Sequence, residues 1–206
     1  MLPAALASPG CVACEVDAAA IRREYSDGEW KQLESGEIVT AEIPSPASND
    51  TERRRVRANG IIRTPAKQVW SVLTDFPSRP EFIPDVEDMA IVRVDGKRVW
   101  VDERLGFLFV EVYFRAINTL EPERGTMSWE LDKSVEHDID DTRGVWQLVP
   151  VADGAHTLIR YWADVDTGQP IPGFIERYLR DSSLPKLLGH IRDEAERRFV
   201  PASGTH

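Results

Sequence analysis

The run from Pro172 to Phe199 constrains the fold of this chain more than any other feature. After Ser183, apolar residues recur every three or four positions with charged residues between them, which is the pattern of an amphipathic helix. Its apolar stripe consists of Leu184, Leu187, Leu188, Ile191, Ala195 and Phe199. The stripe of the preceding segment, Phe174 to Leu179, is out of phase with it by roughly 140°. We therefore predict a short helix, a break at residues 182–185, and then a helix of about 24 Å that covers a large apolar surface.

The middle of the chain supplies that surface as β-strands. Apolar and polar residues alternate in short runs separated by turn residues, a spacing that favours an antiparallel meander. The predicted strands cover 54–63, 86–94, 98–105, 108–120, 126–133, 144–151 and 157–165. Only the last helix is long enough to cover their common apolar face. The sequence therefore predicts an α+β fold in which a curved antiparallel sheet wraps around a long C-terminal helix.

Two small helices are expected between the first strand and the meander. Thr64 is placed as the cap of the first helix and Pro65 as its first residue, with Val69, Trp70, Val72 and Leu73 facing inward. The second is a short turn over residues 78–83.

Residues 1–51 form a separate acidic unit in this interpretation, and residues 201–206 form a tail. The first fifty residues hold nine acidic and three basic side chains. Ser26 and Glu29 fit a capping box, Gly36 is placed to end that helix, and a strand over 38–43 precedes a polar linker. We expect this unit to pack on the main domain through Trp30.

The first fourteen residues leave two questions open. Ala5-Leu6-Ala7 resembles the cleavage site of a secretion signal, although a basic start and most of the apolar core are missing. An ordinary alanine-rich tail of a cytoplasmic protein and the remnant of an export signal both fit. Cys11 and Cys14 have the spacing of a redox pair or half a zinc site, but neither context is visible, so the pair is interpreted as two free thiols.

Charge and motif content exclude several functions. The net charge of −10 is unsuited to binding a nucleic-acid backbone. No apolar run is long enough to form a transmembrane segment, although brief contact with a membrane surface is compatible with the sequence. Because no nucleotide-binding glycine loop, zinc-protease motif or Ser-His-Asp set occurs, no cofactor, metal ligand or catalytic residue is assigned.

Three segments resemble the polyketide cyclase/dehydratase and coenzyme-Q-binding START group of the SRPBCC superfamily. They are AKQVWSVLTDFPSRPEFIPDV (66–86), GVWQLVPVADGAHTLIRYWADVDTG (144–168) and IPGFIERYLRDSSLPKLLGHIRDEAER (171–197). The resemblance covers about residues 52–200 and implies the helix-grip fold of START and Bet-v-like domains. The segment EWKQLESGEIV resembles a leader that precedes this domain in some bacterial members.

The resemblance also implies a cavity between the sheet and the C-terminal helix. The side chains expected to line it are Val112, Phe114, Met127, Trp129, Trp146, Leu148, Tyr161, Leu184, Leu187, Leu188 and Ile191. Such a cavity would bind or carry a hydrophobic small molecule, such as a lipid, an isoprenoid quinone or a polyketide-like ring system. Two alternatives stay open: an enzyme of the aromatase/cyclase or dehydratase type, and a protein-interaction module with a closed pocket.

A few polar residues are candidates for a chemical role. His137 lies in an acidic run that favours a solvated loop over a metal site, and His190 borders the apolar stripe of the last helix. Arg115 and Arg160 alternate with apolar neighbours and are expected to point outward. A buried carboxylate or histidine inside the cavity would favour the enzyme.

Overall fold

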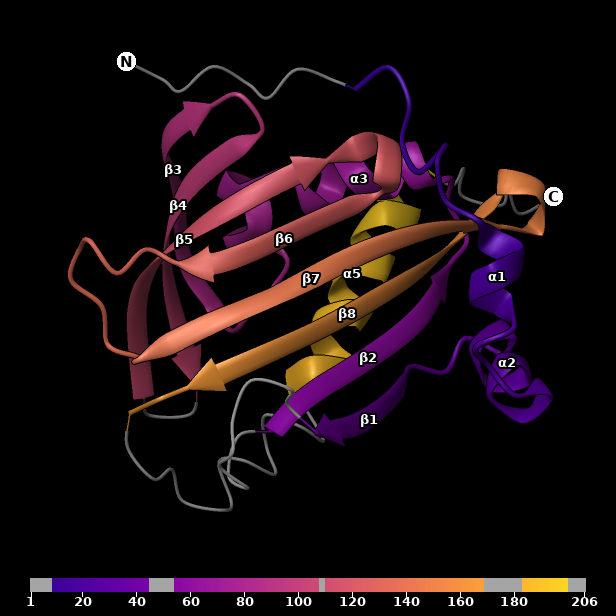
Figure 1. The fold of residues 1–206 in the computed structure, drawn as a ribbon, viewed down its shortest axis with the longest axis horizontal. Coiled ribbons are helices and arrows are strands. Elements are labelled where there is room, and N and C mark those ends of the chain that lie inside the picture. The colour runs from indigo at the N-terminus through magenta and orange to yellow at the C-terminus, as the bar shows by residue number, and fades with distance from the viewer. Residues whose placement is uncertain (1–8, 45–53, 108–109, 169–182, 200–206) are drawn as a thin grey trace, which may run out of the picture.

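The structure is a computed structural model that describes residues 9–44, 54–107, 110–168 and 183–199. Its centre is one antiparallel sheet of eight strands in the order β1-β2-β8-β7-β6-β5-β4-β3 (Figure 1). The strands are β1 (Val39–Pro44), β2 (Arg54–Ile62), β3 (Val86–Asp95), β4 (Arg98–Phe107), β5 (Val110–Glu121), β6 (Thr126–Leu131), β7 (Asp141–Val151) and β8 (His156–Asp166). Strands β3 to β8 form the predicted meander, and β2 and β1 continue the sheet beyond β8. The predicted α+β fold is confirmed.

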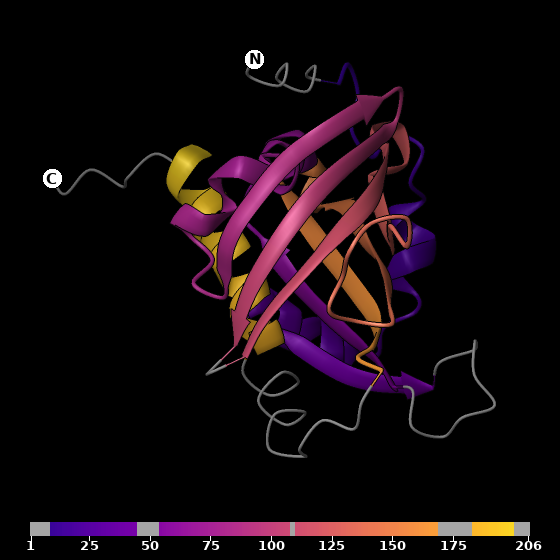
Figure 2. The same cartoon turned by 90° about the vertical axis from the view of Figure 1, so that its left-hand side faces the viewer.

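The sheet curves around α5 (Leu184–Phe199), the C-terminal helix of the prediction (Figures 1 and 2). Leu188, Ile191 and Ala195 are fully buried against the sheet, because they share one side of the helix. Arg192 donates to the carbonyl of Gly36 at 2.9 Å, so the N-terminal part of the chain also contacts α5. The predicted short helix and break lie outside the described residues, apart from the start of α5.

The prediction for the start of the first small helix is wrong. Helix α3 covers Ala66–Leu73, and Pro65 rather than Thr64 takes the cap position, where no side chain caps the helix. Thr64 lies one residue too early, and the carbonyl of this buried residue accepts a hydrogen bond from the Thr157 hydroxyl at 2.7 Å. The inward residues of α3 are buried as expected, and a 3₁₀ helix, η1 (Phe76–Glu81), follows.

The helix with the predicted capping box is present, and a further short helix precedes it. Asp17 accepts a hydrogen bond from the Ala20 amide at the start of α1 (Ala18–Arg22). Ser26 and Glu29 make the complete capping box of α2 (Asp27–Glu34), and Gly36 follows it with a φ of +91°.

These two helices pack on the face of the sheet opposite to α5 (Figure 2). Leu33, with no exposed surface, packs with Val149 and Leu158, whereas Trp30 is only partly buried at the rim of this cluster. The Tyr25 hydroxyl donates to the Asn59 side chain at 3.1 Å. Leu33 and Tyr25 therefore contribute more to the contact than Trp30 does. The domain boundary at residue 51 stays a prediction.

The interpretation of Cys11 and Cys14 as free thiols is wrong, because the structure joins them in a disulfide. Ala13 between them has a φ of +55°, and this left-handed turn brings the two cysteine Cα atoms to 6.1 Å, within disulfide range. Among the helices that the structure describes, none has the length and apolar character needed to cross a membrane.

Candidate functional site

The candidate site is the inner face of the sheet, defined as the face that α5 covers. Alternation along each strand directs every second side chain to this face, and the register aligns them across strands. Tyr161 on β8 lies opposite Trp146 on β7, which in turn lies opposite Met127 on β6. The clean apolar alternation of these strands in the sequence is what produces this wall.

Three aromatic rings meet at its centre. The Tyr161 ring centroid lies 4.3 Å from that of Trp146 and 5.6 Å from that of Trp129, with the second pair stacked at an interplanar angle of 20°. Gly144 makes room for Trp129, since a Cβ atom at Gly144 would overlap the indole ring. Trp129 also donates weakly to the Thr142 hydroxyl at 3.4 Å. The rings form one rigid apolar surface, with the Trp129 N–H and the Thr142 hydroxyl at its edge.

All eleven predicted lining residues, seven on the sheet and four on α5, belong to two adjoining hydrophobic clusters. Nine contribute to the main buried cluster or pack against it: Met127, Trp129, Trp146, Leu148, Tyr161, Leu184, Leu187, Leu188 and Ile191. The other two, Val112 and Phe114, join an adjoining cluster with Ala116, Leu131 and Ile139. Leu105 and Trp129 pack against both clusters, so the two are continuous. A role for these residues in ligand binding stays a prediction.

The apolar residues are not uniformly covered. At the end of the sheet near the start of α5, Val110 keeps 37% and Val165 keeps 48% of its surface exposed. Val112, Leu184 and Leu187 are only partly buried there. At the other end of the inner face, residues of α3 and α5 are buried together in the main cluster.

Polar groups interrupt the wall at positions that the prediction did not include. Arg79 from η1 is 7% exposed, donates to the carbonyl of Leu73 at 2.6 Å, and lies 4.9 Å from the Phe76 ring centroid. Glu103 on β4 is partly buried and lies between Met89 and Phe114 in the register. Asn118, which is 3% exposed, lies on the same face four residues along β5 from Phe114.

Two of these groups have donors without a partner. The Arg79 Nε and the Asn118 Nδ2 are buried and make no hydrogen bond to any residue that the structure describes. A buried donor without an acceptor costs about 1–3 kcal/mol, so native proteins rarely leave one. These two N–H groups are therefore available to an acceptor atom at the inner face.

The charges of this region perturb one another. Burial raises the pKa of Glu103 to about 7, against the opposing attraction of Arg79. Burial also lowers the pKa of Arg79, while the negative charge of Glu103 opposes this effect. The pKa of Tyr161 is raised by burial and, to a smaller extent, by Glu103. Glu103 is thus a carboxyl group that can gain or lose a proton near neutral pH.

Sequence signals existed for two of the three missed residues. Glu103 follows Val99 and Val101 at a spacing of two, and Asn118 follows Phe114 and Ala116 in the same way, so alternation places both on the inner face. Arg79 gave no comparable signal, because it lies in a 3₁₀ segment without a strand or helix period.

The opposite, outer face carries an open groove of about 360 Å³. It is lined by Val92, Arg93, Trp100, Arg115, Asp132 and Ser134. Its charged groups are already paired: Arg115 binds Asp102 through two hydrogen bonds of 2.5 and 3.0 Å, and Asp132 accepts from Ser134. This groove therefore has less to offer a ligand than the inner face. Arg115 points outward as predicted, as does Arg160, which pairs with Glu24 at 2.6 Å.

Neither of the two histidines considered for chemistry, His137 and His190, is fully buried. His190 is partly exposed on α5, and His137 is partly exposed in the loop between β6 and β7. Within the described ranges, no three His, Cys or carboxylate side chains come together as metal ligands would.

Comparisons with known proteins agree with this architecture. The model of the family described as "Polyketide cyclase / dehydrase and lipid transport" matches residues 62–192. No curated protein matches the chain.

Among solved structures, the aromatase/cyclase Zhui from Streptomyces sp. R1128 is 19% identical with a TM-score of 0.63, covering 75% of this chain and 100% of its own. The STAR-related lipid transfer protein from Xanthomonas axonopodis is 18% identical with a TM-score of 0.62, covering 77% and 93%. Human STARD10 is 12% identical with a TM-score of 0.63, covering 90% and 83%. At these identities the likeness shows the fold alone.

Proposed function

Because the chain belongs to the polyketide cyclase / dehydrase and lipid transport family, we propose that it binds a hydrophobic small molecule between the inner face and α5. The observation that carries this proposal is the pair of unpartnered donors, Arg79 Nε and Asn118 Nδ2, at a wall that is mostly apolar and also holds Glu103. An apolar molecule with one or two acceptor oxygens satisfies both features of the site. A lipid, an isoprenoid quinone and a polyketide-like ring system all fit this description.

Apolar contact supplies most of the affinity in this proposal. The stacked rings of Trp129 and Tyr161, with Trp146 tilted at 51° against Tyr161, offer an apolar surface to a ring or an acyl chain. Each Å² of apolar surface removed from water contributes about 25 cal/mol, so the wall favours binding without any charged contact. The oxygen that accepts from Arg79 then fixes the orientation of the ligand.

Entry occurs at the end of the inner face where Val110 and Val165 are exposed. Exposed apolar side chains at the rim of a binding site reduce the area of an entering apolar ligand that faces water. The N-terminal part of α5 borders this rim through Leu184 and Leu187, whereas its C-terminal part is held by buried residues.

A fluorescent apolar probe tests the proposal. We expect binding to quench tryptophan emission, and Trp146→Ala or Leu188→Asp to weaken binding at least tenfold. Trp100→Ala in the outer groove is the matched control and should leave the affinity unchanged. If Trp100→Ala weakens binding and Trp146→Ala does not, the site is the outer groove. If the folded protein binds no probe, the interior is closed, which favours the protein-interaction module.

Native mass spectrometry of protein purified from its own host complements the probe. A co-purifying lipid or quinone that is absent from Leu188→Asp would identify the ligand class. The same mass in both proteins would point to contact with the surface instead.

An aromatase/cyclase type of enzyme is the second candidate, and Glu103 favours it. A carboxyl group with a pKa of about 7 serves as a general base or acid at neutral pH. In a polyketone, the Glu103 carboxylate would take a proton from the carbon between two carbonyls, forming an O–H bond as the C–H bond breaks. The negative charge would move to the carbonyl oxygen, which the Arg79 guanidinium can stabilise.

Proton exchange separates the enzyme from the binding protein. A long-chain 1,3-diketone in D₂O should exchange its central protons faster in the presence of the enzyme, and Glu103→Gln should abolish the effect while leaving diketone binding intact. If the wild type and Glu103→Gln give the same exchange rate, binding is the only function that the experiment supports.

A further inference from the structure

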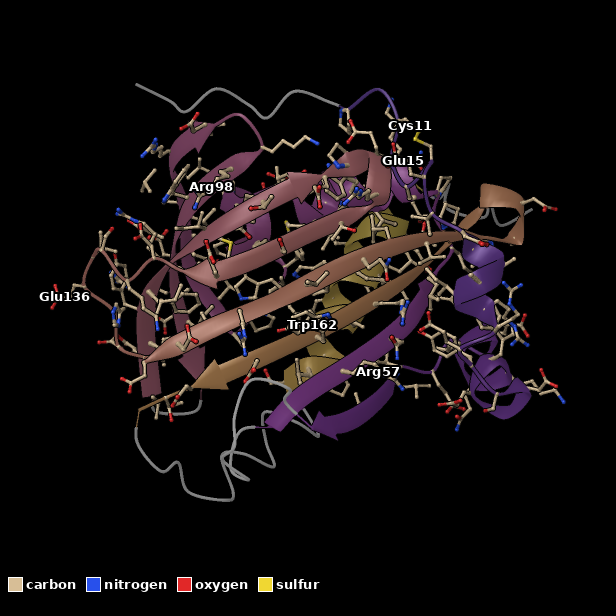
Figure 3. The ribbon with its side chains drawn as sticks, viewed as in Figure 1. Cys11, Glu15, Arg57, Arg98, Glu136 and Trp162 are labelled. Carbon is tan, nitrogen blue, oxygen red and sulfur yellow. A yellow bond between two sulfur atoms is a disulfide. The ribbon has the colours of Figure 1, made fainter. Side chains whose placement is uncertain are left out.

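The segment Cys11–Glu15 is fixed to the turn between β5 and β6, far from it in the sequence. The amide of Ala13 donates to the carbonyl of Pro122 at 2.7 Å, and the amide of Glu15 donates to that of Glu123 at 3.0 Å. The Glu15 carboxylate also lies 3.8 Å from Arg124 in the same turn, η2 (Pro122–Arg124). Figure 3 shows Cys11 and Glu15 beside this turn. Two backbone bonds and one ion pair therefore attach the segment.

Ala13 enters the core of the main domain. Its side chain is 2% exposed and belongs to the same buried cluster as Trp146 and Leu188. The contact requires Gly125, because a Cβ atom there would lie 2.8 Å from the Ala13 Cβ and 2.6 Å from the Leu148 oxygen. Gly125 also has a φ of +60°, which glycine adopts without strain.

The conformation of Ala13 is unfavourable on its own. A φ of +55° is rare for a residue with a Cβ atom, and such a conformation persists only where the surroundings enforce it. The Cys11–Cys14 disulfide encloses Ala13 in a ring of four residues and so limits the alternatives. Both cysteines are solvent-exposed, so the bond is open to attack by a thiolate.

We propose that the Cys11–Cys14 disulfide is a redox-controlled clip, which holds Ala13 in the core when oxidised and releases residues 11–15 from the β5–β6 turn when reduced. The co-reactant is a dithiol. One of its thiolates attacks a sulfur atom of the clip, the S–S bond breaks, and a mixed disulfide forms. The second thiol of the reductant then attacks the reductant's own sulfur in the mixed disulfide and displaces the cysteine sulfur. The reductant leaves as a cyclic disulfide, and the chain retains two protonated thiols. This inference does not depend on the proposed ligand.

Residue-resolved hydrogen exchange tests the clip in three forms of the full chain. These are the oxidised protein, the same protein reduced with dithiothreitol, and the double variant Cys11→Ser/Cys14→Ser. Closing a four-residue loop restricts the open state enough to slow local opening about twentyfold. We expect the amides of Ala13 and Glu15 to exchange about twentyfold faster in the reduced protein and in the double variant.

The internal control is the amide of Leu148, which donates to Gly125 across the same turn at 2.8 Å without involving the clip. It should exchange at the same rate in all three forms, and a low-molecular-weight disulfide should restore protection of Ala13 only in the wild type. Equal exchange of Ala13 in oxidised and reduced protein overturns the proposal. So does equal acceleration at Leu148, because the disulfide would then stabilise the whole domain. The reduced wild type gives this answer even if the double variant does not fold.

Discussion

Replacement of Glu103 by glutamine removes a carboxyl group on the inner face whose pKa is strongly raised by burial. Its pKa is about 7 in the folded protein against an ordinary value of 4.5. Between these pH values the folded state retains a proton that the unfolded state has lost. The free energy of unfolding of the wild type therefore falls as the pH rises from 4.5 to 7, and this contribution is constant above that window.

The size of the effect follows from the same interval. At about 1.4 kcal/mol per pKa unit, the distance from 4.5 to 7 corresponds to about 3 kcal/mol. Because the Glu103 side chain is only partly buried, solvent screens its charge, and this value is an upper limit. Glutamine resembles the protonated carboxyl group in size and stays neutral at every pH. Glu103→Gln should match the wild type near pH 4.5 and exceed its stability by up to about 3 kcal/mol at pH 8.

Urea denaturation of both proteins from pH 4.5 to 8 measures this difference. Glu130→Gln on the outer side of β6, where the side chain is 67% exposed, is the matched control for removing one carboxylate. A difference between Glu103→Gln and the wild type that does not change with pH would refute the reasoning. It would mean that water or a rearranged Arg79 fully compensates the Glu103 charge.

Three further predictions concern the contacts that surround the site. Removal of residues 1–51 should leave a domain that melts cooperatively but is less stable by about 3–6 kcal/mol, because Val149 and Leu158 lose their cover, Ala13 leaves the main cluster and β1 leaves the sheet. Aggregation or a broad transition in circular dichroism would show that the domain does not fold without these residues. Leu33→Ala should cost about 2–5 kcal/mol in urea denaturation and more than Trp30→Ala, since Leu33 is fully buried; the reverse order would show that Trp30 carries the contact. Hydrogen bonds, those from Arg197 foremost, lower the pKa of Glu194. Glu194→Gln should therefore lower the free energy of unfolding by about 1–3 kcal/mol at pH 7 and by less as the pH falls below 4.5. A loss that is constant from pH 7 to 4 would contradict this.

The sequence predicts the sheet and the last helix well because their signals are local and repeated. Period-two alternation from residue 86 to 165 appears in the structure as six strands of the sheet. Of the predicted stripe, Leu188, Ile191 and Ala195 are fully buried and Leu184 and Leu187 are partly buried, whereas Phe199 at its end is 39% exposed. The wrong prediction that Thr64 caps the first small helix has a different origin. Threonine and proline are both common at helix starts, and in the fold the Thr64 carbonyl instead accepts a hydrogen bond from Thr157, a long-range contact that sequence patterns do not reveal.

The candidate site likewise has a part that the sequence predicts and a part that it does not. Its apolar wall follows from alternation, since a residue that faces inward does so whatever lies opposite. The charged part does not, because the proton affinity of Glu103 depends on how much water the fold removes from it and on where Arg79 is placed. Arg79 reaches the inner face from a 3₁₀ segment, whose position is set by the packing of Phe76 and Ile83 under the sheet. Alternation alone would place a charged residue at position 103 on an apolar wall and so indicate a functional position. Only the fold places this carboxyl group where burial raises its pKa to about 7, and this shift is what makes proton transfer at the inner face testable.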